Sequence, residues 1–300
     1  MGVVTGAGLG ERLPLMDDEI AAKHVLLDFE LITLIALAMG VGVYAVLRRV
    51  KRHRSGLEKP PGDFDGFDLI LMFFPAMFFL INPIAEALIA GKEDPGELTA
   101  EIEASPVVSI LMNLGYFMFV GVMTYGLIEW VRNRSVSDLF GLRRLRPANI
   151  IVLSIIGGVF SLLLCGWIVG DFANRYLESL FGELDLQEPV KMLRESESPV
   201  HLILAVVMAC VAAPFVEELL FRGYMYRTLR ELTHPVFSAI IIAGLFAVVH
   251  GNLPALLPLL VFSLLLTIAY EATRCLWVPI GMHAFFNAAN IVLMMTDTGE

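Results

Sequence analysis

Three groups of polar side chains stand out in a sequence that is otherwise strongly apolar. The first group is Glu217, Glu218 and Arg222, which follow a nearly unbroken apolar run over residues 202–213. One ionised side chain at the centre of a membrane helix costs about 2.5–3.5 kcal/mol, so three such groups naively cost on the order of 8–10 kcal/mol. Because packing alone rarely justifies this penalty, ionisable residues in a membrane helix indicate a functional site.

The spacing inside this first group predicts different roles for the two carboxylates. Glu218 and Arg222 are four residues apart, so they share a helix face and can form an ion pair. Glu217 points about 100° away from Glu218. We therefore expect Arg222 to hold Glu218, which leaves Glu217 to act as a general base. The alternative interpretation is a capping or interfacial ion pair without a catalytic role.

The other two groups are His250 and the pair of His283 and Asn287. His250 follows the apolar run 240–249, with Phe246 on the same helix face. His283 and Asn287 are four residues apart, so one of them can donate a hydrogen bond while the other orients it. Each group alone also fits a structural role, as a core histidine or as a hydrogen bond between membrane helices.

The three groups match in their expected depth. The glutamates lie about ten residues before Arg227, and His283 lies nine residues after Arg274. His250 lies about fifteen residues after the turn at 233–235. If these reference points mark one membrane face, a rise of 1.5 Å per residue places all three groups roughly 13–23 Å from that face. We therefore expect them to converge on one site within the bilayer.

Hydrolysis of a peptide bond is a reaction that uses these side chains. A glutamate can take a proton from water, and histidines with an asparagine can hold the water or stabilise the oxyanion. Alternatively, Glu217, His250 and His283 could bind zinc with water in the fourth position. The HExxH helix that usually signals such a zinc site is absent from the sequence. The residues alone leave both chemistries open.

The composition is that of a polytopic membrane protein. Of 300 residues, 57% are hydrophobic and only 17% are charged, against roughly 25% charged in soluble domains. The net charge of −10, without a basic stripe, gives no indication of nucleic-acid binding. A membrane helix needs about 20 mostly apolar residues, and this rule predicts an all-α fold with about eight spans. The predicted spans are 29–48, 68–90, 107–130, 149–170, 199–222, 236–250, 254–270 and 276–295.

The polar groups divide the chain into two parts. All of them follow residue 198, so we expect residues 1–197 to be a membrane scaffold of about four spans, and residues 198–295 to carry the site. The spans 236–250 and 254–270 are short, and the joining Gly251–Pro254 segment is soon followed by Pro258. These features predict a broken or re-entrant pair of helices. Non-helical backbone at that depth requires cover by protein or by a water-filled cavity.

The distribution of arginine and lysine predicts the orientation of the chain. Basic residues follow the first, third and fifth spans and precede the eighth, so they lie on one side if the spans alternate. The loops 92–105 and 171–197, on the other side, are acidic. We therefore expect a multi-pass protein of the cell membrane with its N-terminus outside and its site toward the cytoplasmic half.

The three groups also form motifs that resemble those of a known family. Residues 217–222 match EExxxR, residues 246–250 match FxxxH and residues 283–287 match HxxxN. In this order, within an all-helical membrane segment, they resemble the CPBP family of intramembrane proteases. This family includes CAAX prenyl proteases and bacteriocin-processing enzymes and is also called the Abi family. The resemblance covers about 95 residues, 198–292, and no motif position departs from the pattern.

The resemblance implies a conical cavity that is open toward the cytosol and the bilayer, and it implies roles for the polar groups. Glu217 would activate water with assistance from His250, and His283 with Asn287 would stabilise the oxyanion. Members are often described as metalloproteases, whereas we favour the metal-free mechanism based on a glutamate. Zinc is the alternative cofactor.

The resemblance further implies that Glu218 and Arg222 support the site. The expected partners are the lipid bilayer and a membrane-associated protein or peptide substrate, with or without a prenyl group. Two other functions stay open. One is a catalytically silent peptide-binding or immunity protein. The other is a proton-coupled transporter, for which Glu86 is a further candidate residue, although no matching broken helix occurs in the first half of the sequence.

Overall fold

The computed structural model describes residues 64, 66–71, 106–131, 133–181 and 198–296, and every regular element among them is a helix. The predicted all-α class is therefore confirmed for this part of the chain. Five of the described helices are long and apolar enough to cross a membrane, so the chain is an integral membrane protein. These five are Ile110–Trp130, Pro147–Tyr176, Pro199–Leu232, Pro254–Thr273 and Trp277–Thr296.

Most of the long helices consist of consecutive α-helical and π-helical segments. The segments labelled η are π-helical, a geometry that is often found at functional sites. In chain order the elements are α2 (Gly66–Leu71), α4 (Pro106–Gly126), η1 (Leu127–Val131), α5 (Val136–Leu139), α6 (Pro147–Ser161), η2 (Leu162–Val169), α7 (Gly170–Phe181), α9 (Pro199–Val207), η3 (Met208–Ala212), α10 (Ala213–Glu218), η4 (Leu219–Tyr226), α11 (Arg227–Leu232), α12 (Pro235–Val248), α13 (Leu253–Thr273) and α14 (Trp277–Thr296).

The described helices account for part of the predicted spans. The prediction 29–48 lies outside the described residues, and of 68–90 only the part up to residue 71 is described, so the count of about eight is not confirmed. The predictions 107–130 and 276–295 agree closely with α4–η1 and α14. The fourth and fifth predicted spans continue further than expected, as helices that reach Phe181 and Leu232.

Of the two helices that were expected to be short, only the first one is short. Helix α12 has 14 residues, as a short element should, whereas α13 runs for 21 residues with Pro258 inside it. The expectation that 254–270 is also short was wrong. The missing N–H of Pro258 would have bonded to the carbonyl of Pro254, in the first helical turn, so the proline removes one bond near the helix start. Asn252 caps this start, because its side chain accepts a hydrogen bond from the Ala255 amide at 2.8 Å.

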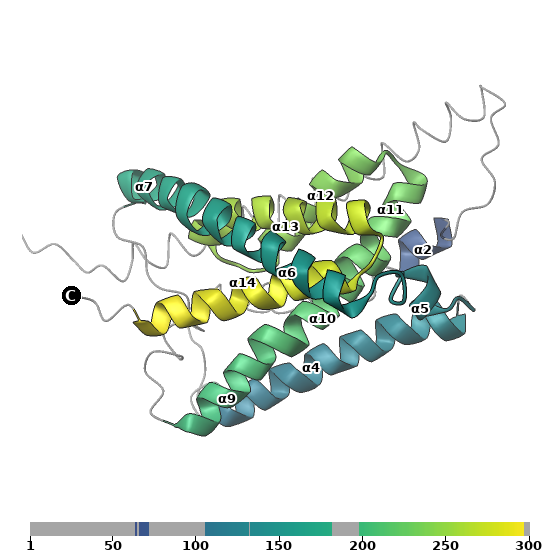
Figure 1. Ribbon diagram of the computed structural model, residues 1–300, viewed down its shortest axis with the longest axis horizontal. Coiled ribbons are helices and arrows are strands. Elements are labelled where there is room, and N and C mark those ends of the chain that lie inside the picture. Colours follow the sequence, from purple (N-terminus) through teal and green to yellow (C-terminus); the bar gives the residue numbers. More distant parts are fainter. Residues whose placement is uncertain (1–63, 65, 72–105, 132, 182–197, 297–300) are drawn as a thin grey trace, which may run out of the picture.

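Close packing of α14 against α6 holds the helix that carries His283. The two helices lie side by side near the middle of the bundle (Figure 1). The hydroxyl of Ser154 on α6 donates to the Val278 carbonyl on α14 at 3.2 Å. A Cβ added to Gly281 would lie 2.7 Å from the Ser154 Cβ. Glycine is therefore required for this approach of the two helices.

The loops that were expected on one membrane face meet at one end of the bundle. The amide of Leu276, before α14, donates to the Phe140 carbonyl, after α5, at 3.0 Å. Glu271 on α13 binds Arg230 at 2.9 Å and Arg274 at 2.7 Å. Gly141, with φ of +63°, packs against the Arg274 carbonyl, which a side chain at this position would displace.

Candidate active site

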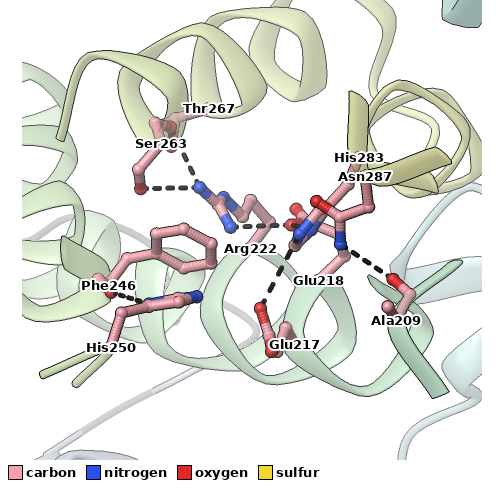
Figure 2. A network of polar contacts seen from close by, with 10 residues as sticks. All are labelled: Ala209, Glu217, Glu218, Arg222, Phe246, His250, Ser263, Thr267, His283 and Asn287. Atoms are coloured by element: carbon pink, nitrogen blue, oxygen red, sulfur yellow. Dashed lines mark hydrogen bonds and ion pairs between the residues drawn. The ribbon is translucent and has the colours of Figure 1, made fainter. Parts of the chain in front are cut away.

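The first polar group lies at the junction of α10 and η4, inside the protein. The side chains of Glu217, Glu218 and Arg222 are 6%, 0% and 0% exposed, respectively. Arg222 Nη1 lies 2.8 Å from Glu218 Oε1, so the predicted ion pair is confirmed (Figure 2). Both side chains are fully buried, which means that neither charge contacts bulk solvent.

Arg222 is held by two further elements. Its Nη2 donates to both the side-chain oxygen and the backbone carbonyl of Ser263 on α13, at 2.6 and 3.0 Å. Its guanidinium carbon lies 4.7 Å from the centroid of the Phe246 ring on α12, a cation–π contact. The sequence interpretation missed Ser263. The available signal was Ser263 and Thr267, a hydroxyl pair at four-residue spacing within an apolar helix.

His283 joins the third polar group to the first. Its Nδ1 lies 3.0 Å from Glu218 Oε1, and its Nε2 lies 3.9 Å from Glu217 Oε2. A carboxylate only accepts, so Nδ1 carries a proton in this contact. The rings of Phe262 and Phe246 meet the imidazole edge to face, at 5.3 and 5.8 Å. The expected convergence of these two groups is therefore observed, through Glu218.

Glu217 is the carboxylate that the arginine does not bind. Among the described residues, no hydrogen-bond donor reaches its buried Oε2 atom. His283 Nε2 lies 3.9 Å from that atom, a distance longer than a hydrogen bond. Glu218 Oε2 likewise has no donor among the described residues, so the two adjacent carboxylates differ in that Glu218 is fixed through its Oε1 atom by Arg222 and His283.

His250 lies beside this cluster without bonding to it. Its Nδ1 lies 2.6 Å from the Phe246 carbonyl, and its ring centroid lies 4.7 Å from that of the Phe246 ring. Since a carbonyl only accepts, Nδ1 carries the proton, and Nε2 of the neutral ring has the lone pair. The Phe246 side chain contacts His250, His283 and Arg222, so it connects the second group to the others.

Asn287 forms a hydrogen bond to another membrane helix. Its Nδ2 donates to the Ala209 carbonyl on η3, in the membrane helix Pro199–Leu232, at 2.8 Å (Figure 2). This bond is the structural alternative considered for the pair, a hydrogen bond between membrane helices, and it does not involve His283. The amide is turned that way because η3 packs directly on α14. An amide nitrogen has two hydrogens, and this bond uses one of them.

The set of Glu217, His250 and His283 does not fit a zinc site as the structure places it. Among the residues described, no three side chains of the types His, Cys, Asp and Glu are grouped so that they could hold a metal ion. His250 does not contact the two other side chains of the set and bonds instead to the Phe246 carbonyl. Glu218, the other glutamate nearby, is already paired with Arg222. Glu86, the further residue considered for a transporter, lies outside the described residues.

Two comparisons with known proteins agree with the motifs. Residues 199–289 match the family model of the type II CAAX prenyl endopeptidase Rce1-like proteins. Over 135 residues the chain is 27% identical to a protein of Bacillus subtilis (strain 168) named "Putative membrane peptidase YdiL". This alignment covers 43% of the chain and 55% of that protein, so the chain spans about half the length of this curated relative. No solved structure matches the chain. The resemblance to CPBP-family proteases is confirmed for this segment.

Proposed function

We propose that this chain, whose residues 199–289 resemble type II CAAX prenyl endopeptidases, is an intramembrane endopeptidase that hydrolyses a peptide bond of a membrane-associated protein or peptide. The observation that carries the proposal is the separation of the two glutamates. Arg222 neutralises Glu218, whereas the Oε2 atom of its neighbour Glu217 is buried beside His283 without a donor among the described residues.

The proposed reaction begins at Glu217. Its carboxylate takes a proton from a water molecule while the water oxygen attacks the carbonyl carbon of the scissile bond. The carbonyl π bond opens and leaves an oxyanion on the tetrahedral intermediate. The protonated Glu217 then gives its proton to the leaving amine as the C–N bond breaks, and the oxyanion closes to the new carboxyl group. The step needs no co-reactant besides water.

The other polar groups suit supporting roles in this reaction. Nε2 of His250 can accept a hydrogen bond from the attacking water, because Nδ1–H already donates to the Phe246 carbonyl. The second amide hydrogen of Asn287 can be donated to the oxyanion. His283 can donate from Nε2 when both of its ring nitrogens carry protons. Glu218 and Arg222 hold that imidazole in place.

We propose that the site faces the cytoplasmic half of the membrane. This orientation is supported by the meeting of Arg230, Glu271 and Arg274 at the end of the bundle where α5 also lies. Arg143, Arg144 and Arg146, in the loop after α5, are basic as well. A bundle end rich in arginine is expected on the cytoplasmic side. We expect the substrate to approach from the bilayer, with a lipid-modified C-terminal peptide as the first class to test.

The test is a cleavage assay with the 300-residue chain in nanodiscs and fluorogenic CAAX peptides with and without a prenyl group. We expect Glu217→Gln to lower kcat by a factor of at least about 100, because it removes a general base without changing the size of the side chain. Glu271→Gln is the matched control, since it makes the same change in a glutamate outside the site. Its kcat should stay within about threefold of wild type.

Two outcomes would contradict the proposal. If Glu217→Gln retained the kcat of the control, Glu217 would not be the base. If neither peptide nor a panel of membrane-associated peptides were cleaved by the wild type, the silent peptide-binding function would be the better explanation. A further assay with a metal chelator, followed by addition of zinc, distinguishes the metal-free mechanism from a zinc-dependent mechanism. Activity that is lost to the chelator and restored by zinc would replace the metal-free mechanism.

A further inference from the structure

We propose that Ser263 is a positioning residue that fixes Arg222 and, through Arg222 and Glu218, the imidazole of His283. The inference rests on the proposed function and adds a residue on α13, a helix to which none of the three sequence motifs extends. It starts from one feature of Ser263, namely that this fully buried serine offers two oxygen atoms to a single guanidinium nitrogen.

The contact between Ser263 and Arg222 has a defined direction. Arginine has only donors, so both the hydroxyl oxygen and the carbonyl oxygen of Ser263 accept from Nη2. The hydroxyl contact, at 2.6 Å, is the shorter of the two. The carbonyl oxygen also accepts from the Thr267 hydroxyl at 2.9 Å, so two side chains share it. The hydroxyl oxygen is therefore the acceptor of Ser263 that is dedicated to Arg222 among the described contacts.

A continuous series of short contacts leads from Ser263 to the proposed reaction centre. Arg222 reaches Glu218 Oε1 at 2.8 Å through its other terminal nitrogen, Nη1. The same oxygen lies 3.0 Å from His283 Nδ1. His283 Nε2 in turn lies 3.9 Å from Glu217 Oε2. A rotation of the guanidinium therefore moves Glu218 Oε1, which is the atom that orients the imidazole.

The other contacts of Arg222 do not fix this rotation. The Phe246 ring centroid lies 4.7 Å from the guanidinium carbon, and this cation–π contact does not select which N–H group points in which direction. Arg222 Nε has no acceptor among the described residues. The in-plane angle is thus set by the contacts of the two terminal nitrogens, with Glu218 at one and Ser263 at the other.

The test is the Ser263→Ala variant in the same cleavage assay. A hydrogen bond to a charged group contributes enough to change a rate by roughly ten- to a hundredfold. We expect kcat to fall in that range while KM changes by less than about threefold, because the substrate does not contact Ser263. Ser238→Ala is the matched control. It also removes a fully buried hydroxyl, which is hydrogen-bonded to Thr233 and the His234 carbonyl away from the site.

A double-mutant cycle with Arg222→Lys separates positioning from a general structural effect. Lysine keeps the charge but lacks the planar fork that reaches Ser263 and Glu218 together. If Ser263 acts through Arg222, adding Ser263→Ala to Arg222→Lys should change kcat by less than about threefold. If the reductions in kcat caused by Ser263→Ala and Arg222→Lys multiplied in the double variant, the inference would be overturned. A kcat of Ser263→Ala equal to that of Ser238→Ala would overturn it as well.

Two further controls keep the result interpretable. Thermal unfolding of each purified variant shows whether the fold is intact. If Ser263→Ala does not fold, Ser263→Cys replaces the oxygen by a weak acceptor of similar size, and the same loss of kcat is expected. Wild-type turnover is the reference for both proposals. Its absence would contradict the proposed function, whereas unchanged turnover in the Ser263 variants would contradict only the positioning role.

Discussion

The ion pair between Glu218 and Arg222 makes a sharp prediction about stability. Both side chains are 0% exposed, and their charged atoms are 2.8 Å apart. Removing one partner of a buried pair typically costs about 3–5 kcal/mol, because the other charge is left without compensation. We therefore expect Arg222→Met to lower the free energy of unfolding by about this amount. The adjacent Glu217 is buried as well, at 6% exposure.

A second substitution, at Glu218, tests whether the loss of unfolding free energy in Arg222→Met is caused by the unpaired charge. In the double variant Glu218→Gln, Arg222→Met, no charge of the pair remains, so we expect about half of the lost stability to return. The double variant should nevertheless be inactive, since the side chain at position 218 is no longer fixed by Arg222 and therefore no longer holds His283 in place. Recovery of stability without recovery of activity would distinguish the structural role of the pair from its role in the proposed reaction.

The assay is unfolding of the purified protein in detergent by a denaturant, with cleavage measured in parallel. Arg230→Met is the control, because the Arg230–Glu271 pair lies at 26% and 27% side-chain exposure and should contribute less than about 1 kcal/mol. A loss of less than about 1 kcal/mol in Arg222→Met would refute the reasoning. The reasoning would equally fail if the double variant were as unstable as the sum of its single variants.

Two further predictions concern α14. Gly281→Ala should lower the free energy of unfolding by about 1–3 kcal/mol, because the added Cβ would meet Ser154 at the contact with α6, and detergent unfolding checks this. Asn287→Ala should lower kcat on the order of 100-fold, because it removes a donor that is proposed for the oxyanion, and the cleavage assay checks this.

Each of these two predictions has a matched control in the chain. Gly115→Ala adds a methyl group where nothing lies within 4 Å, so it should leave stability unchanged or slightly improved. Asn290→Ala removes an amide that bonds to the Phe286 carbonyl of its own helix, so kcat should stay within about threefold. Equal effects of Gly281→Ala and Gly115→Ala, or of the two asparagine variants, would contradict the packing and oxyanion arguments, respectively.

What the sequence predicted correctly about the site depends on contacts within one helix. The four-residue spacing of Glu218 and Arg222 is enough to predict their ion pair, since both side chains lie on one face whatever the rest of the fold does. Matching depths along the membrane normal predicted that His283 would approach the glutamates, which it does at 3.0 Å from Glu218. Depth limits which residues can meet, but it does not select the partner.

The contacts that the sequence did not predict depend on how neighbouring helices are rotated. Ser263 is 41 residues from Arg222, and Ala209 is 78 residues from Asn287, so no local spacing connects them. The length of α13 was underestimated for another reason. Pro254 and Pro258 suggest a break in the sequence pattern, but prolines near a helix start remove few hydrogen bonds, and the asparagine cap at residue 252 stabilises this start.

The shortness of α12 has a consequence for how water could reach a hydrolytic site inside a membrane. Its 14 residues extend roughly 21 Å, less than the hydrocarbon thickness of about 30 Å. If α12 begins at a membrane face, the turn that follows it, with Gly251 at φ of +58°, lies inside the hydrocarbon layer, where backbone polar groups need partners from protein or water. The amides of His250 and Gly251 have such partners in the carbonyls of Ala247 and Val248. His250 and Gly251 are exposed there. For the proposed hydrolysis, we expect the water nucleophile to enter past this turn, whereas we expect the substrate to approach from the bilayer.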